Sequence, residues 1–232
     1  MCKYSKKLLI LHQYIDTNMK KLTIEEMGRI SVAEFKAAAK APLILVSDNV
    51  RSLNNIGSFF RTADAFRLQG IWLCGISGTP PSAEIHKTAL GAEDSVEWRY
   101  FENTLDAVSH LKADGYEVWA LEQAHDSVKL ENFSVSPDAR IALVVGNEIK
   151  GVSQDVIDEC SGCIEIPQYG TKHSLNVSVA AGITLYNIVK QLNYCASESR
   201  SQTCLGYAER SQYYSGQALI NTSRKGEALT YN

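Results

Sequence analysis

Short apolar runs alternate with segments of helical periodicity through the middle of this chain of 232 residues. Residues 43–46 (Leu-Ile-Leu-Val) form a continuous apolar run that ends in a polar Ser-Asp-Asn, as expected of a buried strand that runs into a loop. Residues 54–66 follow with apolar side chains at helical spacing. Strands that alternate with helices predict an α/β fold, with a mostly parallel sheet and helices on both of its faces.

The same alternation continues along the chain, without an internal repeat. We expect further strands at 70–76, 96–101, 116–121, 141–145 and 164–167, and further helices at 21–39, 105–111 and 176–193. Within the first of these helices, Ser31 and Glu34 have the spacing of a capping box, which marks a helix start.

The distribution of charged residues along the sequence predicts that the chain has three parts. Residues 1–40 carry 8 basic and 4 acidic side chains, residues 41–195 carry 11 and 19, and residues 196–232 carry 4 and 3 in a Ser-, Gln- and Tyr-rich context. We expect a basic N-terminal arm or helix, one α/β domain and a C-terminal tail. Met19, before two lysines, is a second sensible start for the chain. The local positive charge suits a polyanion, although lysines that only solubilise a tail explain the same excess.

Several classes of protein are disfavoured. No apolar window approaches the roughly 18–20 residues of a membrane span, and no signal peptide is evident, so we expect a cytoplasmic protein. Six scattered cysteines do not make a disulfide framework. Cys160 and Cys163 form the one close pair, but no second ligand pair completes a zinc site, so we expect no metal and interpret them as buried thiols beside a turn into a strand.

Three loops at predicted strand ends carry unusual polar residues. In the first, Asn55 lies near a helix start and Arg61 follows almost two turns later, within reach of one pocket. Taken alone, this motif favours a purely structural interpretation, with Asn55 as a helix cap and Arg61 paired with Asp64.

The second loop, 144–152, has Gly146 at a strand end and Gly151 five residues later. This spacing is neither a P-loop nor a dinucleotide-binding signature, and it indicates a close ligand or a tight turn. The third loop, 166–183, leads into a helix rich in small residues, where Ser174, Asn176 and Ser178 are candidate caps. His173 and Ser174 are adjacent and are not a hydrolase dyad.

Together the three segments resemble the SpoU/TrmH family of RNA ribose methyltransferases, within the SPOUT superfamily. The matching motifs occur in the family's order between residues 42 and 193: Asn-x-Gly-x-x-x-Arg (55–61), Gly-x-Glu-x-x-Gly (146–151) and Ile-Pro…Ser-Leu-Asn-Val-Ser-Val (166–179). The flanks lie outside the resemblance. It implies a SPOUT-like methyltransferase domain over residues 41–195, with a C-terminal trefoil knot within about 141–193.

The resemblance also implies a cofactor, S-adenosylmethionine, bound in a bent form in the knot. The matching cofactor-binding positions are Leu121, Gly146, Ile166 and Leu175, with Glu148 and Asn176 close by. Backbone groups at the strand ends would bind the adenine edge, and the apolar side chains would enclose the ring.

The implied reaction transfers a methyl group to a ribose 2′-hydroxyl in tRNA or rRNA. Arg61 matches the family's essential arginine; because a guanidinium stays protonated in proteins, we expect it to hold the target phosphate and stabilise the developing alkoxide. Asn55 would orient Arg61 or the ribose, Ser174 and Asn176 would align sugar and donor, and Glu148 would steady the pocket.

Similar proteins are homodimers in which the arginine of one subunit reaches the pocket of the other. The RNA would lie across the dimer on Arg51, Arg67, Lys150 and Lys172, although Arg51 and Arg67 are equally well explained as ordinary surface charges. Two alternatives stay open: a non-catalytic RNA-binding dimer of the same fold, and a methyltransferase for a base or small molecule. The catalytic residues disfavour the first, and Arg61 disfavours the second.

Overall fold

The computed structural model describes residues 20–23, 25–192 and 194, which belong to two compact units divided between Ser31 and Val32. The described part of the first unit contains a turn, in which the Thr23 N–H donates to the Glu26 carboxylate at 2.7 Å. The predicted tail at 196–232, and most of the predicted arm with Met19, lie outside the described residues. The proposed limits of the three parts therefore stay predictions.

The second unit is built on a seven-stranded sheet in which every neighbouring pair of strands is parallel. Its order is β3-β2-β1-β6-β4-β7-β5, so β6 lies between two strands that precede it in the chain. The strands are β1 (Ala41–Asp48), β2 (Leu68–Cys74), β3 (Trp98–Phe101), β4 (Glu117–Leu121), β5 (Val128–Lys129), β6 (Ile141–Val145) and β7 (Gly162–Glu165).

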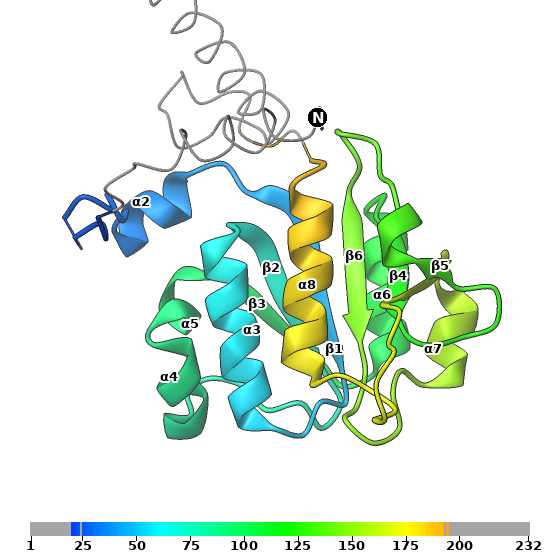
Figure 1. Cartoon of the computed structure of the whole chain (residues 1–232). Coiled ribbons are helices and arrows are strands. Elements are labelled where there is room, and N and C mark those ends of the chain that lie inside the picture. The colour runs from blue at the N-terminus through cyan, green and yellow to red at the C-terminus, as the bar shows by residue number, and fades with distance from the viewer. Residues whose placement is uncertain (1–19, 24, 193, 195–232) are drawn as a thin grey trace, which may run out of the picture. The chain divides into compact units, whose positions relative to one another are not determined.

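Helices cover both faces of this sheet (Figure 1). One layer contains α3, α4, α5 and α8, and the other contains α6 and α7. The helices are α2 (Val32–Ala37), α3 (Leu53–Ala65), α4 (Ala83–Ala89), α5 (Ala92–Ser95), α6 (Thr104–Ala113), α7 (Gln154–Glu159) and α8 (Val177–Val189), with a 3₁₀ turn at Leu130–Asn132. Within the described ranges, none of them reaches the length and hydropathy that a membrane crossing needs.

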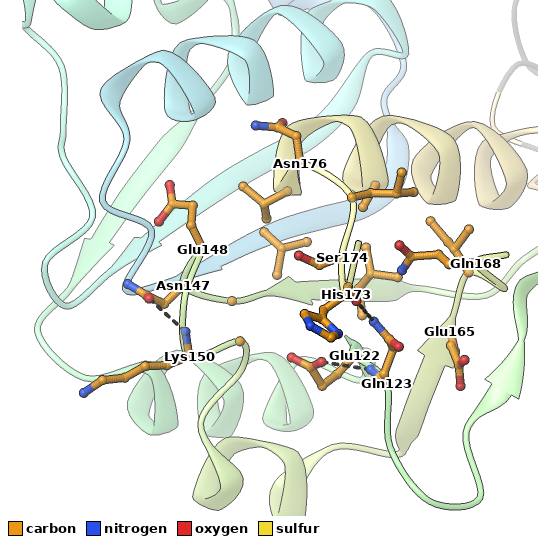
Figure 2. A pocket seen from close by; sticks show the side chains of 18 of the residues that line it. Glu122, Gln123, Asn147, Glu148, Lys150, Glu165, Gln168, His173, Ser174 and Asn176 are labelled. Carbon is orange, nitrogen blue, oxygen red and sulfur yellow. Dashed lines mark hydrogen bonds between the residues drawn. The ribbon is translucent and has the colours of Figure 1, made fainter. Parts of the chain in front are cut away.

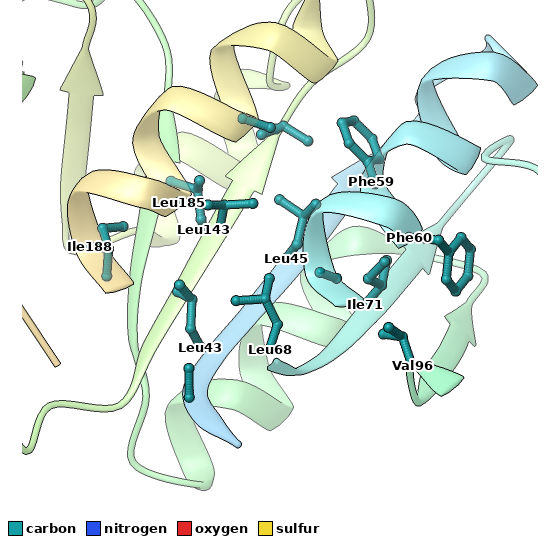
Figure 3. Packing of buried hydrophobic residues seen from close by; sticks show 14 of the residues in the cluster. Leu43, Leu45, Phe59, Phe60, Leu68, Ile71, Val96, Leu143, Leu185 and Ile188 are labelled. Carbon is teal, nitrogen blue, oxygen red and sulfur yellow. The ribbon is translucent and has the colours of Figure 1, made fainter. Parts of the chain in front are cut away.

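Side chains on β1 alternate between two apolar cores, as the period of a strand requires. Leu43 and Leu45 enter the core beneath α3 and α8, where Phe59 lies fully buried (Figure 3). Ile44 and Val46 enter the second core, beneath α6 and α7. Because β1 is buried on both faces, it has the continuous apolar sequence from which a parallel strand was predicted.

The predicted α/β class is confirmed, and most predicted elements form within a few residues of their expected limits. The prediction of a helix over 21–39 is wrong for most of that range. Described residues 25–28 make a turn in which Gly28 has φ +57°, and α2 begins only after Ser31. The strand predicted at 164–167 lies two residues earlier; Pro167 has no N–H to donate to a sheet.

Candidate functional site

A cavity of about 470 Å³ opens at the carboxyl edge of the sheet, where β4, β6 and β7 end. Its polar side chains come from three loops and from the start of α8 (Figure 2). The lining residues are Leu121, Glu122, Gln123, Val145, Gly146, Asn147, Glu148, Ile149, Lys150, Gly151, Ile164, Glu165, Ile166, Gln168, His173, Ser174, Leu175, Asn176, Val177 and Ala180.

All four positions predicted to bind a cofactor line this cavity. Leu121 ends β4, Gly146 directly follows β6, and Ile166 directly follows β7, while Leu175 comes from the loop before α8. The structure therefore brings together residues that lie up to 54 positions apart in the chain. Apolar walls beside strand-end backbone groups are typical of a site for a small organic ligand.

A chain of side-chain hydrogen bonds joins the three motif segments beside the cavity. The Asn55 amide nitrogen donates to Glu148 Oε1 at 2.9 Å, and the Asn55 amide oxygen accepts from Asn176 Nδ2 at 3.1 Å. Asn55 is 7% exposed, so water does not readily replace either bond. One residue from each of the three motifs is thus held in a single arrangement.

Asn176 is also the N-cap of α8. Its Oδ1 accepts from the Ser178 N–H at 2.9 Å and from the Ser178 hydroxyl at 2.6 Å. The capping role and the contact with Asn55 therefore coexist in one side chain. In contrast, Asn55 does not cap α3, because that position is taken by Ser52.

The Glu148 carboxylate is bound to the start of α3. Its oxygens accept from the backbone N–H groups of Arg51 at 3.0 Å and Ser52 at 2.9 Å, besides the Asn55 amide. Partial burial alone would raise the pKa of this carboxyl, but these donors outweigh burial and the pKa is lowered. Glu148 is therefore an anion that fixes one loop against a helix, and it is a poor proton acceptor.

The loop that carries Glu148 folds back tightly on the end of β6. Asn147 and Gly151 exchange backbone hydrogen bonds of 3.0 and 2.8 Å, and Gly151 has φ +70°. A Cβ at Gly146 would lie 2.1 Å from the backbone of Gly151 and Val152. Gly146 is required by the chain's own tight loop, which is one of the two alternatives that the sequence left open for this glycine.

Arg61 does not line the cavity of its own chain. It is exposed on α3, and its side chain makes no hydrogen bond or ion pair with any residue that the structure describes. The expected alternative partner, Asp64, instead accepts a 2.6 Å hydrogen bond from Ser95. The glycine of the same motif, Gly57, has a packing role, since a Cβ there would lie 2.3 Å from the Ile85 carbonyl oxygen on α4.

The other predicted residues are spread more widely. Ser174 and Lys150 line the cavity. Lys172 is exposed in the loop between β7 and α8. Arg51 is exposed two residues before α3. Arg67 lies at the opposite edge of the sheet, where its carbonyl accepts from the N–H of Ala41 at the start of β1 and its guanidinium lies 5.8 Å from the Tyr194 ring centre.

Six polar lining residues were not predicted as site residues. They are Glu122, Gln123, Asn147, Glu165, Gln168 and His173. Gln123 donates to the His173 carbonyl at 2.7 Å, and Glu122 accepts from the Val152 N–H at 3.0 Å, so both connect loops around the cavity. Their position just after the predicted strand 116–121 was the available signal, because ligands of parallel sheets bind beyond strand ends.

The close cysteine pair lies around the start of β7. Cys160 and Cys163 are both free thiols, and burial raises the pKa of Cys160 to about 12. A thiol with a raised pKa is a poor nucleophile. Cys163 lies buried within β7, as expected, whereas Cys160, which precedes the strand, is only half-buried. Among the described residues, no three His, Cys, Asp or Glu side chains are grouped to hold a metal ion.

Comparison with known proteins gives matches over this part of the chain. Residues 42–186 match the model of the SpoU rRNA Methylase family. A 23S rRNA (guanosine-2′-O-)-methyltransferase RlmB of Shewanella oneidensis is 31% identical over 180 residues, which are 78% of this chain and 71% of that protein. The chain spans about two thirds of the length of the curated relatives it matches.

Solved structures of the same group are also similar. A TrmH/SpoU tRNA-modifying enzyme of A. aeolicus has a TM-score of 0.61 and 28% identity, covering 69% of this chain and 81% of that one. An AdoMet-bound rRNA methyltransferase of Sinorhizobium meliloti has a TM-score of 0.60 and 29% identity, covering 68% of this chain and 60% of that one.

Proposed function

The chain belongs to the SpoU rRNA methylase family, and from this premise we propose that it methylates the 2′-hydroxyl of a ribose in rRNA or tRNA. The observation that carries the proposal is the hydrogen-bonded series of Glu148, Asn55 and Asn176 beside the cavity. A module that only binds RNA has no need to hold three such residues from separate segments against a small-ligand cavity.

SpoU methyltransferases use S-adenosylmethionine, and the cavity fits such a group. Its volume of about 470 Å³ lies in the range of about 300–1,000 Å³ that is typical of small-ligand sites. Leu121, Ile166 and Leu175 would enclose the adenine, and backbone groups next to Gly146 would bind its edge. When bound, the group supplies an electrophilic methyl on a sulfonium.

The protein's contribution is alignment and electrostatics. Ser174 lines the cavity, and its hydroxyl is free of hydrogen bonds to described residues, so it is available to hold the ribose. Asn55 and Asn176 position the start of α8, and Glu148 positions the start of α3. We assign Glu148 a positioning role rather than that of a base.

Arg61 would stabilise the developing alkoxide and the target phosphate from a second copy of the chain. Two observations support an arrangement in trans. The side chain does not line its own cavity, and α8 beside it exposes an apolar stripe of Val179, Ile183 and Tyr186. Apolar residues at this spacing on a helix suit a two-fold interface between identical chains.

RNA would approach across that dimer. Arg51, Lys150 and Lys172 are exposed on the side of the sheet where the cavity opens, and they are the proposed phosphate contacts there. Arg67 lies at the other edge, so any contact that it makes with RNA is separate from the cavity. The basic N-terminal arm would add electrostatic attraction to the RNA phosphates, which does not depend on the RNA sequence.

The proposal includes a trefoil knot within about 141–193, in a domain over 41–195. The sheet order supports this region as the source, because β6 is inserted between the earlier strands β1 and β4. The family's cofactor site lies at that knot, which suits the cavity at the ends of β6 and β7.

Two measurements test the proposal. Nucleoside mass spectrometry of total rRNA and tRNA from a deletion strain should show the loss of one 2′-O-methylated nucleoside, and the purified protein should restore it with S-adenosylmethionine. Isothermal titration should show binding of S-adenosylmethionine. RNA binding without cofactor binding would instead identify a non-catalytic member, and a missing base methylation would identify a base-directed enzyme.

A further inference from the structure

Two apolar side chains on the loops around the cavity are unusually exposed. Tyr169 is 94% exposed and Ile149 is 80% exposed, which are the two highest values among large apolar side chains in the described part of the chain. Ile149 itself lines the cavity, and Tyr169 directly follows the lining residue Gln168. Exposed aromatic and aliphatic side chains cost solubility, and their position around a ligand cavity indicates a binding surface.

Local hydrogen bonds hold these loops in place. The Ile149 N–H donates to Asn147 Oδ1 at 3.0 Å, within the loop that the Asn147–Gly151 bridge closes. The loop of Tyr169 is held by the 2.7 Å bond from Gln123 to the His173 carbonyl. Both side chains are therefore exposed on loops that hydrogen bonds hold in place.

Each exposed apolar side chain has a lysine nearby in the chain. Lys150 directly follows Ile149, and Lys172 comes three residues after Tyr169; both lysines are exposed. Neither lysine has an ion-pair partner among the described residues, whereas Lys129 pairs with Glu165 of the same cavity at 2.6 Å. An apolar contact next to an unpaired ammonium suits a nucleotide, which has a flat base and an anionic phosphate.

We propose that Ile149 and Tyr169 hold the base of the target nucleotide between them, with its flanking phosphates on Lys150 and Lys172. The base would stack on the Tyr169 ring and contact Ile149 on its other face, and the ribose would lie at the cavity mouth near Ser174. This inference rests on the proposed methylation of RNA. It adds two residues that select an unpaired, accessible nucleotide, because a base that is paired within an RNA double helix cannot enter such a clamp.

Kinetics with tritiated S-adenosylmethionine test the clamp, with total RNA from a deletion strain as the probe. Tyr169→Ala should raise the KM for RNA about tenfold, since base–aromatic stacking is worth about 1–3 kcal/mol. Ile149→Ala should raise it less, and Tyr169→Phe should recover most of the loss because the ring is kept. The dissociation constant for S-adenosylmethionine, measured by titration, should not change in any of them.

Matched controls come from α4 and its C-cap. Leu90 is 63% exposed and Lys87 is exposed, so Leu90→Ala and Lys87→Ala remove similar side chains away from the cavity and should leave the KM unchanged. An unchanged KM in Tyr169→Ala, with a wild-type enzyme that methylates the RNA, would overturn the clamp alone. If the wild-type protein methylates no RNA, the proposed function fails and the clamp fails with it.

Two further outcomes are informative. Ultraviolet cross-linking of the protein to the same RNA, followed by peptide mass spectrometry, should place a nucleotide on the peptide that contains Tyr169. If Tyr169→Ala instead converts a dimer to a monomer in analytical ultracentrifugation, the exposed ring belongs to an interface between copies of the chain and the clamp is wrong.

Discussion

At the scale of single residues, Asn55 uses both halves of its amide. The nitrogen donates to a carboxylate and the oxygen accepts from another amide, so an isosteric aspartate would lose the donor that faces Glu148. Glu148 in turn accepts from two backbone N–H groups at the start of a helix, where a negative charge is favoured. The site therefore depends on the ionised form of Glu148.

This dependence gives a prediction for pH. The folded-state pKa of Glu148 is below the unfolded value of about 4.3, so its carboxylate stabilises the fold above that value, and the stabilisation is lost as the pH falls through the folded-state pKa. Glu148→Gln should therefore lower the free energy of unfolding by about 1 kcal/mol at pH 7, allowing for solvent exposure, and by less below about pH 4.

Urea unfolding at several pH values measures this difference. Glu131→Gln, at an exposed position in the 3₁₀ turn, is the matched control and should show little change at either pH. A deficit in Glu148→Gln that stays constant between pH 7 and pH 3 would show that the charge of Glu148 is irrelevant to stability.

The residue types of the site were predictable, but their contacts were not. Each motif residue had a local explanation in the sequence, such as a cap for Asn55 or an ion pair for Arg61. The structure assigns the cap to Ser52 and the partner of Asp64 to Ser95, because side chains far apart in the chain compete for the same groups. Gln123 was missed because its position after a strand, the one available signal, does not distinguish a site residue from an ordinary loop residue.

At the scale of elements, Asp48 at the end of β1 joins the second layer of helices to the sheet. It is almost fully buried, and its Oδ1 accepts from the hydroxyl of Thr104, the first residue of α6, at 2.6 Å. Its Oδ2 accepts from the N–H of Ser153, the N-cap of α7, at 3.0 Å. The loop that carries Glu148 ends at this Ser153.

Asp48→Asn should consequently destabilise the protein by about 2 kcal/mol. The NH₂ group that replaces one carboxylate oxygen would face a hydrogen-bond donor and could not accept from it. Asp106→Asn is the control, since Asp106 is exposed on α6. Urea unfolding measures both changes, and equal stability of the two variants would show that Asp48 does not hold these helices.

The loop after β6 gives a second prediction at this scale. Gly146→Ala would place a methyl group 2.1 Å from backbone atoms of the folded-back loop, so the loop must move and the cavity must change shape. We expect the loss of S-adenosylmethionine binding in isothermal titration, together with a loss of several kcal/mol of stability. Gly170→Ala is the control, because a Cβ there meets nothing within 4 Å. Normal cofactor binding by Gly146→Ala would contradict the assigned cavity.

Among the helices and strands, the sequence predicted the buried ones best. The strands β1 and β6 were predictable from uninterrupted apolar runs, and the helix α8 from an apolar face that continues over its 13 residues. In contrast, α5 has only 4 residues, so it spans little more than one helical turn and has no measurable period. The tight turn at Gly146 was recognisable as glycine-dependent, but only the fold shows that the glycine accommodates the chain itself.

At the scale of the whole molecule, the site of one chain lacks its predicted arginine. Arg61 is exposed and does not line its own cavity, and α8 has an apolar stripe that is about half exposed. The family resemblance supplied the expectation of sharing between two chains; composition and periodicity did not contain it, because an interface depends on which surfaces the fold leaves exposed. A functional assembly must therefore be tested on mixed chains.

Two inactive variants provide that test. Arg61→Ala should bind S-adenosylmethionine normally but lose about 100-fold or more in methyl transfer, as for the loss of one charge-stabilising group. Leu175→Trp should place a larger side chain in the cavity and abolish cofactor binding. The position is partly exposed, so the fold can accommodate the larger side chain. Each variant alone should be nearly inactive on RNA from a deletion strain.

Mixing the two variants under conditions of subunit exchange should restore activity. In a mixed dimer, the intact cavity of the Arg61→Ala chain would face the intact arginine of the Leu175→Trp chain, so one site of two becomes complete. Random exchange makes about half of the dimers mixed, and the activity should reach about one quarter of the wild-type value. If Arg61 acted on the cavity of its own chain, no mixed dimer would contain a complete site, and the mixture would stay as inactive as its components.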